Sequence, residues 1–304
     1  LVLQVPDDLS PDWPHNGATI TNTSAASWSN GPGDLPASLT DGADVVITVA
    51  EVIDVEASKE WSPASQQFEP GDVSTITLGA QNLSNLSAEA LVVQDPMSAV
   101  DGAAELGADN PFRIVDFQGF GAQALPADAT TVTVDAYVYD TDSETWTWVP
   151  GAAGALPALP TGVEPADVGG VRLTFAGGSI QPDATASTAF TVAQRAADRD
   201  SGATLSGGAS LTNAVSATVV VPGRDGVSDE ATAPFEVGPL TVDVSGSKSI
   251  EPGELPAGGT ATATLGVVNE SNGPVDALTI SDPGFFDADM AFGIVEEDGL
   301  RCSY

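Results

Sequence analysis

Basic residues are scarce in this sequence of 304 residues. Only eight lysines and arginines accompany 43 aspartates and glutamates, which gives a formal net charge of −35. Proteins that bind nucleic acid neutralise its phosphates with lysine and arginine, so a nucleic-acid groove is excluded. Attraction to anionic membrane surfaces is excluded for the same reason. Repulsion among the carboxylates favours solubility and an extended arrangement of modules.

Cysteine and histidine occur once each, as Cys302 and His15. A single cysteine cannot form a disulfide framework within the segment, and one residue of each type cannot form a zinc cluster. Nucleophilic catalysis needs a nucleophile beside a base, and the sequence contains neither G-x-S-x-G nor H-E-x-x-H. We therefore expect no catalytic residues and no enzyme.

Long apolar runs are also missing. No stretch approaches the roughly 18 apolar residues that predict a membrane span, so we expect no direct membrane insertion. Residues 1–10 lack the basic start and the long apolar core of a signal peptide. If the protein is secreted, we expect its signal peptide and its anchor to lie outside this sequence of 304 residues.

Glycine and proline are abundant, with 32 and 22 residues, and they punctuate segments in which apolar and polar residues alternate. A period of two predicts half-buried strands, and no stretch of a dozen residues has a helical period. We expect an all-β protein in which short antiparallel strands form sandwiches. The clearest predicted strands span 45–49, 73–78, 131–139, 171–175, 189–193 and 215–221.

An internal repeat determines the domain organisation. Residues 54–96 match residues 243–283, and a second match aligns GATITN at 17–22 with GASLTN at 208–213. We interpret Pro70-Gly71 and Pro252-Gly253 as equivalent turns before the second strand of each copy. A unit of about 190 residues therefore recurs, and the boundaries of the unit do not coincide with residues 1 and 304.

The repeat predicts three parts. Residues 1–50 form the C-terminal part of a preceding repeat, and residues 51–238 form a complete repeat. Residues 239–304 form the N-terminal part of the following repeat. The middle of the complete unit, about 97–176, is interpreted as an inserted β subdomain, because it has no second copy in the chain.

The ends of the complete unit resemble a known family. The pattern is a lysine, a proline-containing turn, Gly-Asp, an alternating strand that ends in asparagine, a later Asp-Pro, and the closing strand LTNAVSATV. It resembles the conserved tandem repeat domain of giant bacterial surface and adhesin proteins. The resemblance implies immunoglobulin-like sandwiches strung along a cell surface. The matching residues are Lys59, Pro63, Gly71, Asp72, Thr75–Asn82, Asp95, Pro96 and 211–219.

The only two lysines, Lys59 and Lys248, occupy the same repeat position. One interpretation is an ordinary ion pair between Lys59 and a nearby carboxylate such as Asp95. The other is an intramolecular isopeptide bond, as in adhesin and pilin domains of Gram-positive surfaces. In that case a buried neutral Lys59 attacks the amide of Asn213 while a protonated Asp95 polarises the carbonyl.

Two further groups are candidate ligand sites. Asp140, Asp142 and Glu144 alternate between two predicted strands, and hard carboxylate oxygens at this spacing suit Ca²⁺; an Asp-rich hairpin turn is the alternative. Trp146 and Trp148 lie two residues apart on one strand face. They either pack into the core or form an aromatic platform for a carbohydrate or protein.

Four N-x-S/T sequons, at Asn22, Asn82, Asn85 and Asn269, permit glycosylation in a suitable host. These features together predict a structural or adhesive stalk segment of a large secreted, acidic repeat protein at the cell surface or cell wall. A carbohydrate- or protein-binding module in the inserted subdomain is the alternative. The expected partners are neighbouring repeats of the same chain, surface glycans or host proteins, and further copies in head-to-tail self-assembly of a surface layer or filament.

Overall fold

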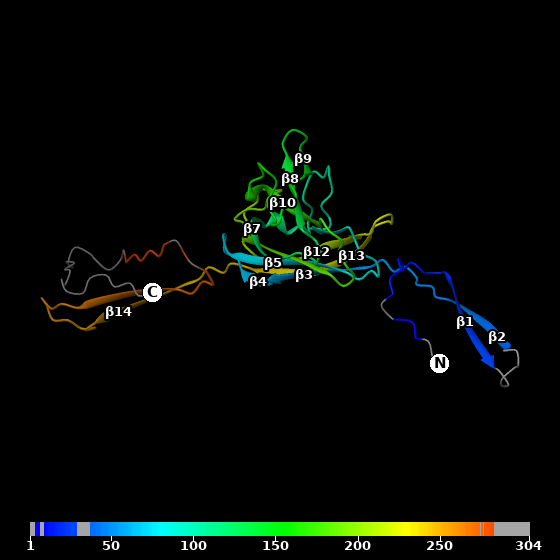
Figure 1. Cartoon of the computed structure of the whole chain (residues 1–304). Coiled ribbons are helices and arrows are strands. Elements are labelled where there is room, and N and C mark those ends of the chain that lie inside the picture. Colours follow the sequence, from blue (N-terminus) through cyan, green and yellow to red (C-terminus); the bar gives the residue numbers. More distant parts are fainter. Residues whose placement is uncertain (1–3, 7–8, 29–36, 274, 276, 283–304) are drawn as a thin grey trace. The chain divides into compact units, whose positions relative to one another are not determined.

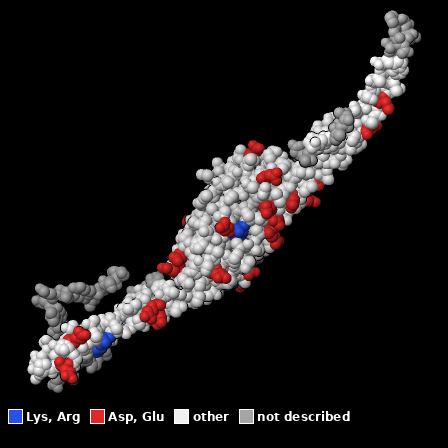
Figure 2. All heavy atoms as spheres, turned by 90° about the horizontal axis from the view of Figure 1, so that it is seen from below, with Lys and Arg blue, Asp and Glu red and all other residues white. Residues whose placement is uncertain are grey.

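The computed structural model describes residues 4–6, 9–28, 37–273, 275 and 277–282. The chain divides into two compact units, residues 1–239 and residues 240–304. Cys302 lies outside the described residues, as does every other residue after Asp282. Acidic side chains are spread over the face shown in Figure 2, and basic side chains are few there.

The larger unit contains a β-sandwich of two sheets (Figure 1). The two sheets enclose one continuous hydrophobic core. The four-stranded sheet is antiparallel throughout and has the order β3-β5-β11-β7. Its strands are β3 (Val55–Ser62), β5 (Val73–Asn82), β11 (Thr185–Gln194) and β7 (Val115–Ala124).

The seven-stranded sheet has the order β4-β13-β12-β6-β10-β8-β9. It is antiparallel except at one edge, where the short β4 runs parallel to β13. Its strands are β4 (Ser65–Gln67), β13 (Val227–Gly238), β12 (Ala209–Val220), β6 (Ala90–Asp95), β10 (Val168–Ala176), β8 (Thr131–Asp140) and β9 (Thr145–Val149). Two 3₁₀ turns, η1 (Pro111–Arg113) and η2 (Pro165–Asp167), precede β7 and β10. No α-helix occurs in the described part of the chain.

The inserted segment is built into both sheets. Its first strand, β7, pairs with β11 and extends the four-stranded sheet. Strand β10 pairs with β6, and β8 and β9 follow it outward in the seven-stranded sheet. The period-two pattern of 131–139 fits this position, because Val132, Val134 and Ala136 all point into the core.

Stacked aromatic rings join the two sheets near the first strand. Trp61 on β3 lies flat against Phe235 on β13, with ring centroids 4.2 Å apart. Strand β3 is an edge strand of its own sheet, yet it packs against both β12 and β13 of the other sheet. The first strand of the unit and its two closing strands are therefore in direct contact.

Two further hairpins precede and follow the sandwich along the chain. The first consists of β1 (Thr19–Trp28) and β2 (Ala37–Val46). The second consists of β14 (Val244–Glu251) and β15 (Thr262–Asn269) and belongs to the smaller unit. The predicted strand at 45–49 overlaps only the last two residues of β2, because the strand begins at residue 37 and ends at Val46.

The β14–β15 hairpin repeats the geometry of the β3–β5 pair. In β14–β15, Lys248 lies opposite Leu265, as Lys59 lies opposite Leu78 in β3–β5. A Cβ atom on Gly266 would overlap Ser247 Oγ, just as one on Gly79 would overlap Ser58 Oγ. This crowding at matching positions shows that the two hairpins are built alike.

The expected equivalence of the two Pro-Gly turns is wrong. Gly71 has a left-handed φ of 97° and precedes β5, and the matching residue before β15 is Gly258, with a φ of 85°. Pro252-Gly253 instead directly follows β14, as Pro63-Ala64 follows β3. Pro70-Gly71 lies near the end of its hairpin loop and Pro252-Gly253 lies at the start of its loop, so the two pairs do not correspond.

Candidate functional site

Three polar side chains meet between the two sheets, and each comes from a different strand. Lys59 points inward from β3, between the buried Ala57 and Trp61, because alternate residues of a strand share one face. Asp95 ends the inward row of β6, and Asn213 begins the inward row of β12. Strand alternation thus places all three in the core.

The carboxylate of Asp95 links the other two groups. Its Oδ1 lies 2.5 Å from Lys59 Nζ and accepts a hydrogen bond of 2.7 Å from Asn213 Nδ2. The side chains of Lys59 and Asp95 are both 0% exposed, and Asn213 is buried as well. The ring of Trp61 closes one side, with its centroid 5.9 Å from Lys59 Nζ. The sandwich therefore encloses an amine, a carboxyl group and a carboxamide away from water.

Several polar atoms at this site have no partner. Asp95 Oδ2, Asn213 Oδ1 and Trp61 Nε1 are buried and form no hydrogen bond within the described part of the molecule. An unsatisfied buried polar atom costs about 1–3 kcal/mol, and native proteins contain few of them. Their concentration around one lysine is typical of a site in which polar groups serve chemistry rather than stability.

Burial changes the acid–base behaviour of Lys59. Loss of water lowers the pKa of its ammonium below the ordinary value of 10.5, and the charge and hydrogen bond of Asp95 oppose this shift without cancelling it. Desolvation destabilises the charged form of a lysine and thereby makes its neutral, nucleophilic form more accessible. The arrangement places a potential nucleophile, an acid and an amide electrophile in one enclosed site.

The candidate calcium residues lie at an exposed hairpin between β8 and β9. Asp140 accepts hydrogen bonds from Asp142 N at 3.0 Å and Ser143 Oγ at 2.8 Å. These bonds, the one from the Asp142 backbone first, lower the pKa of Asp140. Glu144 adopts a left-handed φ of 55°. Within the described residues no group of three or more His, Cys, Asp or Glu side chains is arranged to hold a metal, so calcium at Asp140, Asp142 and Glu144 stays a prediction.

The two tryptophans on β9 pack against the same tyrosine. Tyr137 lies 5.5 Å from Trp146 and 5.0 Å from Trp148, measured between ring centroids. Trp146 is buried, and Trp148 is half-buried beneath the guanidinium of Arg172, which lies 4.6 Å from its ring. Arg172 is held in turn by Asp135, through bonds of 2.7 and 3.0 Å. The pair is thus mostly covered by protein side chains.

Two of the sequon asparagines, Asn82 and Asn269, form matching hydrogen bonds to the backbone. Asn82 is fully buried, and its Nδ2 donates to the Leu86 carbonyl, as Asn269 Nδ2 donates to the Gly273 carbonyl. Asn85 bonds with both ends of its carboxamide to the backbone of Ala50 and Val52. Asn82 is therefore not available to a glycosylating enzyme in the folded state, whereas Asn22 is exposed.

A cluster of arginines and aspartates, which sequence reasoning did not find, fastens the inserted segment. Asp116 on β7 pairs with both Arg195 and Arg199, and Arg113 lies 2.8 Å from Asp198. Burial, together with the charge of Arg195, lowers the pKa of Arg199 to about 10. Arg195 and Arg199 beside Asp198 and Asp200 in the sequence were the available signal, but only the fold brings Arg113 and Asp116 to this segment after β11. A hollow of about 770 Å³ lies beside this cluster and is lined by Tyr139, Trp146 and Arg199 among others.

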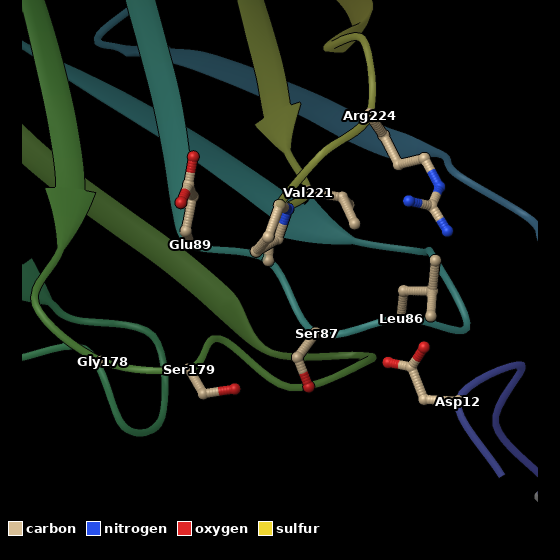
Figure 3. A pocket seen from close by; sticks show the side chains of 10 residues that line it. Asp12, Leu86, Ser87, Glu89, Gly178, Ser179, Val221 and Arg224 are labelled. Carbon is tan, nitrogen blue, oxygen red and sulfur yellow. The ribbon is translucent and has the colours of Figure 1, made fainter. Parts of the chain in front are cut away.

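A second hollow of about 410 Å³ lies at the end of the sandwich where β12 terminates. Figure 3 shows Glu89, Ser87 and Ser179 along it, with Arg224 at one side. Arg224 pairs with Glu51, which precedes β3, and this bond lowers the pKa of Glu51. The ion pair therefore fastens the entry segment of the unit to the loop after β12.

The described part of the chain contains no helix of the length and apolar character that crossing a membrane requires. No family model and no curated protein matches the sequence. Among solved structures, the chain is similar to BcpA, the major pilin subunit of Bacillus cereus, with 11% identity and a TM-score of 0.38. The similarity covers 83% of this chain but only 64% of the pilin subunit.

Two adhesin domains are also similar to the chain. One is the N-terminal domain of the Streptococcus gordonii adhesin Sgo0707, with 11% identity and a TM-score of 0.31 over 66% of this chain and 35% of that one. The other is the collagen binding subdomain of the Enterococcus faecalis surface protein ACE, with 12% identity and a TM-score of 0.24 over 59% of this chain and 95% of that one. With TM-scores below 0.5, these similarities assign neither a family nor a role to this chain.

Proposed function

We propose that this chain is a structural, load-bearing stalk segment of a cell-surface repeat protein, and that an isopeptide bond between Lys59 and Asn213 locks its complete repeat. The observation that carries the proposal is the position of Asp95, whose one carboxylate oxygen contacts both Lys59 and Asn213 inside the core. The tandem arrangement of similar β hairpins and the strongly acidic composition support an extended extracellular role.

The chemistry begins with a proton transfer inside the buried pair. A lysine ammonium and a carboxylate that are both removed from water lose most of their hydration, and this favours a neutral amine beside a protonated acid. Lys59 Nζ then carries a lone pair, and Asp95 carries the proton. Burial, which lowers the pKa of Lys59, acts in the direction that this step requires.

The amine next attacks the carbonyl carbon of Asn213. Half a turn of the carboxamide about its Cβ–Cγ bond places Oδ1 where Nδ2 now faces Asp95, since the two orientations fill the same space. The protonated acid then donates to Oδ1 and stabilises the negative charge that develops on it. The Lys59 Nζ–Cγ bond forms, the Asn213 Cγ–Nδ2 bond breaks, and the nitrogen leaves as ammonia with protons shuttled by Asp95.

The product would be a covalent bridge between β3 and β12. Because β3 is the first strand of the unit and β12 is near its end, a pulling force on the chain passes through this bridge. The residues between the two strands are then shielded from extension. With this bond in place, the unit resists a pulling force through a covalent amide bond, whereas without it the unit resists only through hydrogen bonds and packing.

Intact-mass spectrometry tests the proposal. The purified chain is expected to be lighter than its sequence by one ammonia, and peptide mapping is expected to join the peptides that contain Lys59 and Asn213. Asn213→Ala removes the acceptor and should restore the unmodified mass. Asn16→Ala, a change at an asparagine in the loop before β1, is the matched control and should keep the loss of ammonia. A wild-type protein of unmodified mass would exclude the bond.

A further inference from the structure

The acid of the site lies at the very end of its strand. Asp95 is the last residue of β6, and Pro96 follows it. A proline has no backbone N–H, so it cannot continue the hydrogen-bonded pairing of β6 with β12. The regular pairing of these strands ends at Gln94, which lies opposite Ser216. The reaction nevertheless needs the carboxyl group at a fixed distance from the amine and from the carboxamide of the site.

One further bond joins the two strands beyond the proline. Met97 N donates to the Ala214 carbonyl at 2.8 Å, and Ala214 directly follows Asn213 on β12. The last regular pair of the two strands lies before Asp95, and this bond lies after it. The bond from Met97 therefore fixes the distance between the end of β6 and the part of β12 that carries Asn213.

The carboxamide of Gln94 holds the turn from which this bond is made. Its Nε2 donates to the carbonyls of Pro96, Met97 and Ala99 at 3.4, 3.1 and 3.0 Å. Ala99 N donates back to the Pro96 carbonyl at 3.2 Å, which closes the turn. Gln94 is half-buried and lies on the outward face of β6, whereas the neighbouring Asp95 faces the core. Gln94 therefore points away from the reacting groups and acts on them only through the backbone.

Strand β10 confines the same segment from the other side. Val171 lies opposite Asp95 in the pairing of β10 with β6. The backbone at Gly170 is so close that a Cβ atom there would lie 3.0 Å from Pro96 Cδ and 3.1 Å from the Asp95 carbonyl oxygen. The end of β6 is thus held between β10 and β12, and the turn after it is the part that only Gln94 and the Met97 bond secure.

We propose that Gln94 is a positioning residue for the formation of the bond between Lys59 and Asn213. Its carboxamide fixes the turn that follows β6, and the turn holds the Asp95 carboxyl group between the amine and the amide. The inference rests on the proposed function of these residues. A misplacement of about 1 Å can slow a reaction about 100-fold, so a loosened turn slows the cross-link even where the sandwich is intact.

The test follows the cross-link in time. The 1–304 chain is made by cell-free translation, samples are quenched in denaturant at intervals, and intact-mass spectrometry follows the loss of one ammonia. Gln94→Ala is expected to lose ammonia about 10–100-fold more slowly than the wild type. Gln118→Ala, at an exposed glutamine on β7, is the matched control and should keep the wild-type rate. Urea unfolding in an Asn213→Ala background, where no bond forms, should show that Gln94→Ala is folded in the absence of denaturant.

A second variant separates positioning from a general loss of stability. Met97→Pro removes the N–H that bonds to Ala214, and proline suits the second position of a turn. It should slow the loss of ammonia as well. The double variant Gln94→Ala, Met97→Pro should react no more slowly than the slower single variant, because both changes release the same segment. Two unrelated losses of stability would instead multiply their effects on the rate.

Three outcomes would overturn this inference. A folded Gln94→Ala chain that loses ammonia at the wild-type rate refutes the positioning role and leaves the Lys59–Asn213 bond standing. A rate that falls only in proportion to the fraction of unfolded molecules, or that falls multiplicatively in the double variant, shows that Gln94 only stabilises the fold. A wild-type chain that never loses ammonia refutes the proposed function as well.

Discussion

The carboxylate of Asp95 lies 2.5 Å from the amine of Lys59, and both side chains are fully buried. We therefore expect Asp95 to be required for the reaction between Lys59 and Asn213, although Asp95 is not part of the bond that forms. We expect Asp95→Ala and the shape-preserving Asp95→Asn to keep the full mass of their sequences, because neither can carry the proton to the Asn213 carbonyl. Intact-mass spectrometry measures this directly.

The matched control is Asp140→Ala, which removes an exposed carboxylate from the β8–β9 hairpin. It should lose ammonia as the wild type does. Limited proteolysis of the Asp95 variants shows whether the sandwich has formed. A folded Asp95→Asn protein that still loses ammonia would remove Asp95 from the mechanism.

Contact between the two sheets near the cross-link depends on one aromatic pair. Trp61→Ala removes the ring that stacks on Phe235 and leaves a cavity beside Lys59. We expect the free energy of unfolding to fall by about 3–5 kcal/mol. Urea unfolding should be measured in an Asn213→Ala background, so that no covalent bond holds the strands. Trp28→Ala, at an exposed tryptophan, should change stability by less than about 0.5 kcal/mol.

Stability should depend on pH when the cross-link cannot form. Burial lowers the pKa of Lys59, so between that lowered value and 10.5 the unfolded chain binds one more proton than the folded chain. The stability of Asn213→Ala should therefore rise with pH across this window, by at most about 1.4 kcal/mol per pH unit. Below the window the penalty of the buried ammonium is fully present.

The control for this dependence is the double variant Lys59→Met, Asn213→Ala, which has no amine to titrate. Urea unfolding at a series of alkaline pH values gives the difference between the two proteins. Parallel pH profiles would contradict the assignment of the dependence to Lys59.

The inserted segment is expected to use Trp148 for packing. Arg172 lies over its ring, and Tyr137 lies beside it. Trp148→Ala in the Asn213→Ala background should lower the free energy of unfolding by about 1–3 kcal/mol, from lost burial and a lost cation–π contact. Denaturant unfolding measures the loss. If Trp148→Ala leaves stability unchanged but abolishes binding to a glycan array, the segment is a carbohydrate-binding module instead.

The repeat made part of the site predictable. The sequence contains only two lysines, and both occupy the same position of the repeat although the copies differ widely elsewhere. The alternation of apolar and polar residues places Lys59, Asp95 and Asn213 on the inward faces of their strands. The alternation of apolar and polar residues does not determine which of the two sheets a strand joins. A period of two is the same in both layers, so the pairing of β7 with β11 and of β10 with β6 is fixed only by packing over the whole core.

Short local motifs predicted the structure less well, because their surroundings in the fold come from residues that are distant in the sequence. Asn82 reads as a glycosylation site in sequence, yet its carboxamide clamps a buried loop by bonding to Leu86, Ile180 and Gln181. The bonds to residues about 100 positions away have no local signature. The two Pro-Gly pairs were misleading because one lies near the end of its hairpin loop and the other at the start, while the strands on either side keep their register.

Force spectroscopy on single molecules tests the central claim most directly, because a load-bearing cross-link limits how far the chain can extend. The force is applied through handles at the two ends of the chain. The segment between Lys59 and Asn213 is about 150 residues long, or roughly 50 nm when fully extended. The account predicts that the wild type withholds this length at forces that unfold Asn213→Ala completely. Equal contour lengths for the two proteins would contradict it.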